Sequence, residues 1–178
     1  MVSVKDFIEE YLLGSFWHTT SSARFERIIQ SGFIMADPPL PEAERYGGMP
    51  FVRSLGGVSI FDFPSNFSFE KYEAELPGNS IGEFIPFKRL WGSSIWLRIN
   101  TDMVSNALKS GREIRDLWRK MGSTRRFMAQ VEGAHIGDIP LAAVQDAFEI
   151  GVDVPDMICL NHLLTPPGDS SRKNVQPV

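Results

Sequence analysis

Residues 16–34 read FWHTTSSARFERIIQSGFI, and they decide the fold that we expect for this chain. The opening FWHTT combines aromatic and β-branched side chains, which favour a strand. Ser21 or Ser22 then caps a helix, and Gly32 ends it. The apolar residues that recur on one face of this helix are Phe25, Ile28 and Ile29. A strand, an amphipathic helix and a second short extended piece therefore follow one another.

Further strands and helices are predicted on both sides of this stretch. An amphipathic helix precedes it at 3–13, and a loop rich in Pro and Gly follows it at 36–50. We expect strands at 57–63, 94–100, 127–134, 143–150 and 157–160, and helices at 67–76 and 101–121, the last one split at Gly111. This order predicts an α+β fold with a mixed, mostly antiparallel sheet and flanking helices.

The length and composition are those of one ordinary globular domain. The 178 residues suit a single domain at 1–165, and the polar residues 166–178 predict a flexible tail. The chain has one cysteine and no apolar run long enough to span a membrane. We therefore expect a cytoplasmic protein that does not contact a membrane.

The charge of the chain is unevenly distributed. The formal net charge is −4, which gives no support for nucleic-acid binding by the chain as a whole. Residues 109–126 nevertheless contain seven basic and two acidic side chains. This segment is either the solvated face of a helix or a surface that holds the phosphates of a cofactor or a nucleic acid.

The motifs of several large enzyme and metal-site classes are missing from the sequence. It contains no GxGxxG, no P-loop, no HExxH and no CxxC. Rossmann, kinase, zinc-protease and zinc-finger interpretations therefore have no support. The three histidines are too scattered to indicate a metal site from their spacing.

Two of the predicted strands carry motifs of a known family. Residues 16–20 contain Trp-His and precede a helix with a pair of isoleucines, and residues 57–62 read GVSIFD. The first motif resembles the opening of an ADP-ribosyltransferase domain in the poly(ADP-ribose) polymerase branch. The second is similar to the Gly-Ile-Tyr-Phe-x-Asp strand of that family. The resemblance implies a split sheet and NAD as a substrate.

A third motif resembles the same family. Residues 129–132 read AQVE, and Ile139-Pro140 follows. This stretch is similar to the strand that carries the catalytic glutamate in the DNA-modifying ADP-ribosyltransferase toxins, and the C3-type exoenzymes use a Gln-x-Glu pair. The resemblance makes Glu132 the carboxylate that stabilises positive charge on the ribose. On a strand, Gln130 would share its face and orient an acceptor.

The resemblance also implies which residues hold NAD. His18 corresponds to the histidine that hydrogen-bonds the adenosine-side ribose, and Thr19 would offer its backbone groups to the nicotinamide carboxamide. Arg24, Arg45 and Arg53 are the candidates to meet the pyrophosphate, because an arginine fork matches phosphate oxygens. Arg45 and Arg53 lie closest to the loop arginine that serves catalysis in the DNA-modifying toxins. Ser59 would face the nicotinamide pocket.

One position departs from the family pattern. The tyrosine that lies against the nicotinamide in the family falls on Ser59 here. Either another aromatic residue takes its place, or NAD is bound differently or not at all. The aromatic candidates are Phe61, Phe67, Phe69 and Tyr72.

Four functions are consistent with these residues. The first is a toxin-like, NAD-dependent mono-ADP-ribosyltransferase that modifies a nucleic-acid or protein acceptor. The second is an RNA 2′-phosphotransferase of the same fold, and the third is a non-catalytic relative that binds a nucleotide or a partner. The fourth is an unrelated α+β protein. The motifs at His18 and Glu132 favour the first.

Overall fold

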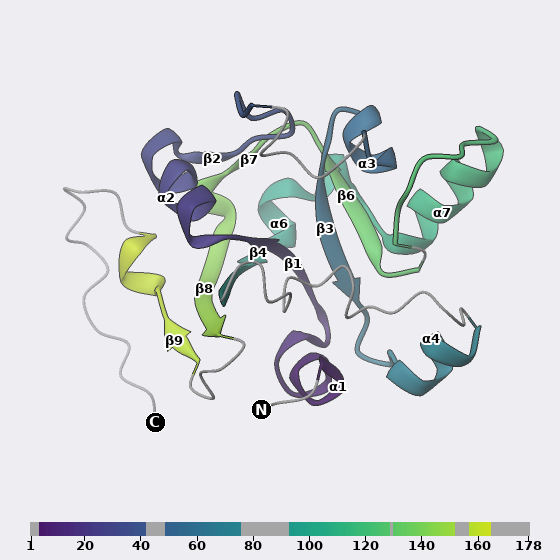
Figure 1. The fold of residues 1–178 in the computed structure, drawn as a ribbon, viewed down its shortest axis with the longest axis horizontal. Coiled ribbons are helices and arrows are strands. Elements are labelled where there is room, and N and C mark those ends of the chain that lie inside the picture. The colour runs from purple at the N-terminus through teal and green to yellow at the C-terminus, as the bar shows by residue number, and fades with distance from the viewer. Residues whose placement is uncertain (1–3, 42–48, 76–92, 129, 152–156, 165–178) are drawn as a thin grey trace.

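The computed structural model describes residues 4–41, 49–75, 93–128, 130–151 and 157–164. Its centre is a seven-stranded sheet in the order β5-β6-β3-β1-β4-β8-β9 (Figure 1). These strands are β1 (Ser15–Thr20), β3 (Gly57–Phe63), β4 (Ser93–Ile99), β5 (Leu108–Lys109), β6 (Glu132–Ile136), β8 (Val144–Gly151) and β9 (Ile158–Cys159). A separate pair consists of β2 (Phe33–Ile34) and β7 (Ile139–Pro140). The predicted tail at 166–178 lies outside the described residues.

Every neighbouring pair of strands in the main sheet is antiparallel. The predictions of an α+β fold and of a mostly antiparallel sheet are confirmed, whereas the parallel strand pair that a mixed sheet implies is not found among the described residues. The reason lies between β1 and β3. A single crossover helix would bring the chain back for a parallel strand. Here α2 (Ser22–Ser31) is followed by β2, which pairs with β7 outside the main sheet, and the chain re-enters antiparallel to β1.

Helices surround the sheet. The α-helices are α1 (Val4–Phe7), α2, α3 (Phe51–Ser54), α4 (Phe69–Glu75), α6 (Thr101–Val104) and α7 (Gly111–Lys120). A π-helix, η1 (Ile8–Leu12), continues α1, and 3₁₀ turns lie at η3 (Ser105–Ala107), η4 (Leu141–Ala143) and η5 (Asn161–Leu163). The helix α7 packs against β6, far from β9 (Figure 1). No helix within the described ranges has both the length and the apolar character that a membrane crossing requires.

The two faces of the sheet carry separate apolar clusters. Trp17, Phe61 and Trp96 lie on one face, where η1 contributes Leu12 and α4 contributes Tyr72. The other cluster includes Val58, Ile60, Leu97 and Ala147 from the strands and Phe25 and Ile28 from α2. This division follows from the two-residue period of side chains along a strand. The core therefore lies on both sides of β1 and β3.

The local predictions around β1 and β3 are confirmed. The helix α2 begins after Ser21 and ends at Gly32, whose φ of 75° is a left-handed conformation that glycine adopts without strain. The strand β3 has the predicted bounds, and Pro64 follows it. The Asn100 side chain caps α6, since it accepts a hydrogen bond from the backbone of Asp102 at 3.1 Å.

The predictions around Gly111 and Glu132 are wrong in two respects. Within the range 127–134 predicted as a strand, residues 130 and 131 form a turn and β6 begins only at Glu132. Gly111 begins α7 after the short strand β5, and it does not split a longer helix. A Cβ at Gly111 would lie 2.3 Å from the carbonyl oxygen of Gln130, so this close approach requires glycine.

Candidate functional site

The main sheet divides between β1 and β3. Their pairing ends at Trp17↔Phe61, and beyond it β1 continues against β4 while β3 continues against β6. His18 is the next residue of β1, and its Nδ1–H donates to the carbonyl oxygen of Ser59 at 2.9 Å. The imidazole therefore joins the two strands where their backbone pairing has ended.

Glu132 joins the same group of residues from β6. It is buried, with 8% of the residue exposed. Its Oε1 accepts a hydrogen bond from Oγ of Ser59, and its Oε2 accepts one from the backbone N–H of Met128, both at 2.5 Å. Strand pairing explains the first contact, because Glu132 lies opposite Phe61, and Phe61 and Ser59 share a face of β3. Ser59 thus binds His18 through its backbone and Glu132 through its side chain.

Burial governs the protonation of both ionisable residues. It raises the pKa of Glu132, against the opposing effect of the hydrogen bonds from Ser59 and Met128. Burial lowers the pKa of His18; the bond to the Ser59 carbonyl opposes this change, and the charge of Arg24 adds to it. A neutral imidazole that donates from Nδ1 keeps Nε2 as an acceptor. The group therefore offers one buried carboxyl group, whose neutral form burial favours, and one neutral imidazole ring.

Two buried hydroxyl groups near these residues have no hydrogen-bond partner in the described part of the chain, namely Oγ1 of Thr19 and the hydroxyl of Tyr72. Alternation along β1 places Thr19 on the same face as Trp17. Tyr72 packs against that face, and its pKa is raised to about 12 by burial and then by the negative charge of Glu132. Because buried hydroxyls normally have partners, each would gain a hydrogen bond from a polar ligand.

The chemistry of this group depends on whether Glu132 is ionised, and burial favours the neutral form of its carboxyl group. A carboxylate in such a position interacts strongly with a nearby positive charge, because the local dielectric is low. The hydrogen bonds to Glu132 hold both of its oxygens in place. Within the described ranges, no group of three or more His, Cys, Asp and Glu side chains is arranged to hold a metal ion. The arrangement is suited to stabilising a cationic centre of a polar ligand.

Gln130 does not lie on a strand with Glu132, and that prediction is wrong. Its φ of 72° belongs to a left-handed turn, whereas a strand requires extended backbone. Its Nε2 donates to Oε2 of Glu75 in α4 at 2.8 Å. The backbone of Asp62 in β3 donates to the carbonyl oxygen of Val131 at 2.7 Å, which holds the end of the turn against the sheet. Gln130 therefore contacts α4 and not the face of β6.

Other residues predicted to bind NAD lie outside this group. Phe61 is 7% exposed and stacks on Phe63 with ring centroids 5.8 Å apart, so it belongs to the core. Arg53 donates from Nη2 to Asp37 at 3.0 Å. Arg45 lies outside the described residues. The predicted residues that the structure brings together are His18, Ser59 and Glu132, and Thr19 follows His18 along β1.

Two groups of the site could not be singled out from the sequence, namely the backbone N–H of Met128 and the side chain of Tyr72. The Met128 N–H carries no signal in the residue pattern, because every residue except proline has such a group. Tyr72 was one of four aromatic candidates, and the helix that holds it was predicted at 67–76. Within α4, Tyr72 is the buried residue. The apolar face of that helix is the signal that would have singled it out.

None of the protein-family models matches the chain, and no curated protein matches it in sequence. The functional interpretation therefore depends on the hydrogen-bonded group of His18, Ser59 and Glu132 and on the motifs that contain these residues.

Proposed function

We propose that the chain is an NAD-dependent ADP-ribosyltransferase, which cleaves the bond between nicotinamide and ribose and transfers ADP-ribose to a nucleic-acid or protein acceptor. The observation that carries this proposal is the hydrogen-bonded link from His18 through Ser59 to Glu132. These residues come from the three motifs that resemble the family. They also meet where β1 and β3 separate, which accords with a split sheet.

In the proposed reaction, Glu132 acts on the ribose of NAD. The bond between C1′ and the nicotinamide nitrogen breaks, and its electron pair leaves with nicotinamide. The ionised carboxylate of Glu132 stabilises the positive charge that develops on the ribose. An oxygen or nitrogen of the acceptor then bonds to C1′ and loses its proton to solvent. The hydrogen bonds from Ser59 and Met128 favour the ionised carboxylate that this role requires, because they oppose the rise in pKa from burial.

His18 and Thr19 supply polar groups for the rest of NAD. Because Nδ1 of His18 donates to Ser59, Nε2 of the neutral ring is available to accept a hydrogen bond from a ribose hydroxyl. Burial supports this neutral state, since it lowers the pKa of His18. The buried Oγ1 of Thr19, without a partner among the described residues, suits the carboxamide of nicotinamide.

A second candidate function is favoured by the enclosure of Glu132. Both of its oxygens already accept hydrogen bonds, and it is buried. Ser59 also stands where the family has a tyrosine. A non-catalytic relative would hold a nucleotide or a partner in the same place without cleaving the glycosidic bond.

Calorimetric titration of NAD, together with an assay for free nicotinamide, separates these two functions. An active transferase predicts that wild type and Glu132→Gln both bind NAD and that only wild type releases nicotinamide. A non-catalytic relative predicts binding by both proteins and release by neither. His18→Ala should weaken NAD binding in either case, whereas His162→Ala, at an exposed position in η5, should not. A wild-type protein that neither binds nor cleaves NAD would contradict both functions.

A further inference from the structure

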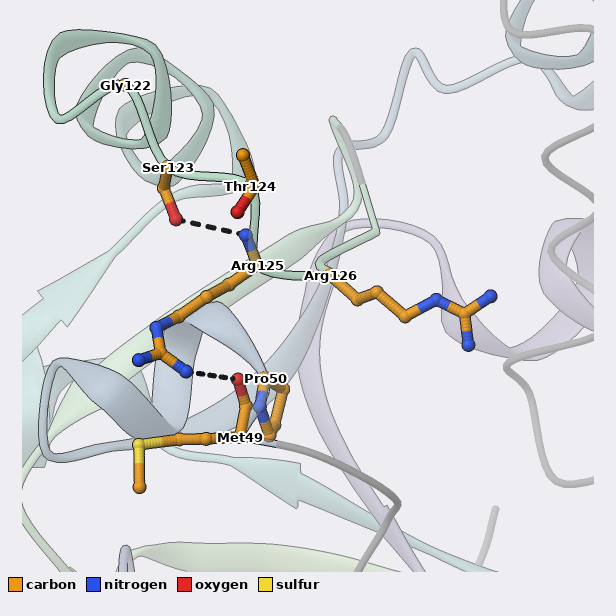
Figure 2. A pocket seen from close by; sticks show the side chains of 7 residues that line it. All are labelled: Met49, Pro50, Gly122, Ser123, Thr124, Arg125 and Arg126. Carbon is orange, nitrogen blue, oxygen red and sulfur yellow. Dashed lines mark hydrogen bonds between the residues drawn. The ribbon is translucent and has the colours of Figure 1, made fainter.

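A cavity of about 620 Å³ lies between the loop that follows α7 and the residues that precede α3 (Figure 2). Arg125 and Arg126 line it, together with Met49, Pro50 and the loop residues from Gly122. None of the residues that line this cavity belongs to the group formed around Glu132. It is therefore a separate feature, and the wall formed by the loop after α7 carries two positively charged side chains.

Hydrogen bonds fix the backbone from which the two arginines extend. The carbonyl oxygen of Arg125 accepts from Nε1 of Trp118 at 2.9 Å, and the carbonyl oxygen of Arg126 accepts from the backbone of Phe51 at 2.9 Å. In addition, Nη1 of Arg125 donates to the carbonyl oxygen of Met49 at 3.1 Å. Groups held in this way lose less conformational freedom when a ligand binds.

The two guanidinium groups point in different directions. Arg125 turns back toward Met49, whereas Arg126 extends away from it (Figure 2). No carboxylate among the described residues pairs with either group. Each guanidinium group therefore keeps N–H donors for an anion. Because the two groups point in different directions, they are placed to bind two separate anionic groups instead of one.

Positive charge continues from the cavity along α7. Arg119 and Lys120 are exposed in the last turn of that helix, directly before the cavity wall begins. Both acidic side chains of α7 are already engaged, Glu113 in the capping box and Asp116 with Arg115. The surface formed by the cavity and the last turn of α7 is thus basic, although the whole chain has a net charge of −4. Such local concentration of one sign attracts extended polyanions.

We propose that the cavity and the adjoining end of α7 bind the phosphate groups of an extended polyanion. The guanidinium fork of arginine matches the oxygens of a phosphate and can donate two parallel hydrogen bonds to it. Two divergent arginines require a ligand with more than one phosphate. The shared chemistry is found in the strand of a nucleic acid and in free polyphosphate. This proposal does not depend on NAD cleavage.

Binding of a fluorescent oligothymidylate to the full chain, measured by anisotropy at several salt concentrations, tests this proposal. For wild type, the logarithm of the affinity should fall linearly with the logarithm of the salt concentration. Arg126→Gln should weaken binding and reduce that slope by about 0.7, which is the contribution of one phosphate contact to a single strand. Lys71→Gln removes an exposed charge from α4 and should change neither quantity.

Competition with tripolyphosphate distinguishes the two sources of phosphate. If tripolyphosphate displaces the oligonucleotide, and Arg126→Gln weakens the binding of both ligands, the site recognises phosphate groups from either source. If tripolyphosphate does not displace the oligonucleotide, and Arg126→Gln still weakens oligonucleotide binding, the site is assigned to a nucleic-acid strand. The proposal is overturned if wild type binds neither ligand, or if Arg125→Gln and Arg126→Gln both bind with wild-type affinity and slope. Melting temperatures of both variants verify that they are folded.

Discussion

The hydroxyl of Ser59 donates a hydrogen bond of 2.5 Å to Oε1 of Glu132, and this contact joins the side chains of β3 and β6. The carbonyl oxygen of the same serine accepts the Nδ1–H of His18 at 2.9 Å. A single small residue therefore positions both ionisable side chains of the site.

Replacing Ser59 by alanine removes one of the two hydrogen bonds to the buried carboxylate. When Glu132 is ionised the acceptor is charged, and we then expect the free energy of unfolding to fall by about 1.5–3 kcal/mol. Urea unfolding at neutral pH measures this loss. Ser54→Ala is the matched control, because that hydroxyl donates to the neutral carbonyl oxygen of Phe51 at 2.6 Å and should cost about 0.5–1.5 kcal/mol. A smaller loss for Ser59→Ala than for Ser54→Ala would contradict the role of this contact.

The Glu132 carboxyl group should make stability depend on pH. Burial raises its pKa above the usual 4.5, so the native state binds this proton more tightly than the unfolded chain does. Stability should therefore fall as pH rises from 4.5 through the raised pKa. Urea unfolding across this range should show wild type losing stability relative to Glu132→Gln, whose amide can still bond Ser59 and Met128. Glu26→Gln, at an exposed position of α2, should instead follow wild type.

His18 should produce a pH dependence of the opposite sign. Burial lowers its pKa below the usual 6.5, so the unfolded chain binds this proton more tightly than the native state does. Wild type should therefore lose stability relative to His18→Gln as pH falls below 6.5. Thermal unfolding at several pH values measures the difference. His162→Gln serves as the control at an exposed position, and a difference of equal size there would contradict the prediction.

Gly111 should be intolerant of a side chain because it lies against the turn that precedes Glu132. A Cβ at this position would lie 2.3 Å from the carbonyl oxygen of Gln130, so Gly111→Ala must displace the turn. We expect a loss of about 1–3 kcal/mol in the free energy of unfolding, as for other overpacked sites. Arg112→Ala changes the neighbouring exposed residue of α7 and should have little effect. Chemical unfolding of the two variants checks this contrast.

The sequence predicted those elements whose signals are local. The bounds of β3 follow from its β-branched and aromatic residues and from the proline that comes after them, and the end of α2 follows from Gly32. His18, Ser59 and Glu132 were identified from their motifs, and their hydrogen-bonded link is consistent with that choice. The motifs thus located the residues of the site more reliably than they located the ends of the strands.

The turn at Gln130 had no such signal. Glutamine has no preference for the left-handed region, and its conformation here depends on contacts with β3 and α4 that are distant in sequence. The residues 127–134 therefore predicted a strand that begins too early. The same limit applies to β5, whose two residues are too short for any periodic pattern. Both features are determined by tertiary contacts.

Free nicotinamide, measured by chromatography after incubation with excess NAD, tests the central claim most directly. We predict that nicotinamide accumulates with wild type and with His162→Gln, and that it does not accumulate with Glu132→Gln. Equal release by wild type and Glu132→Gln would contradict the role of Glu132. Tight binding of NAD by wild type without any release would contradict cleavage and would favour the non-catalytic function.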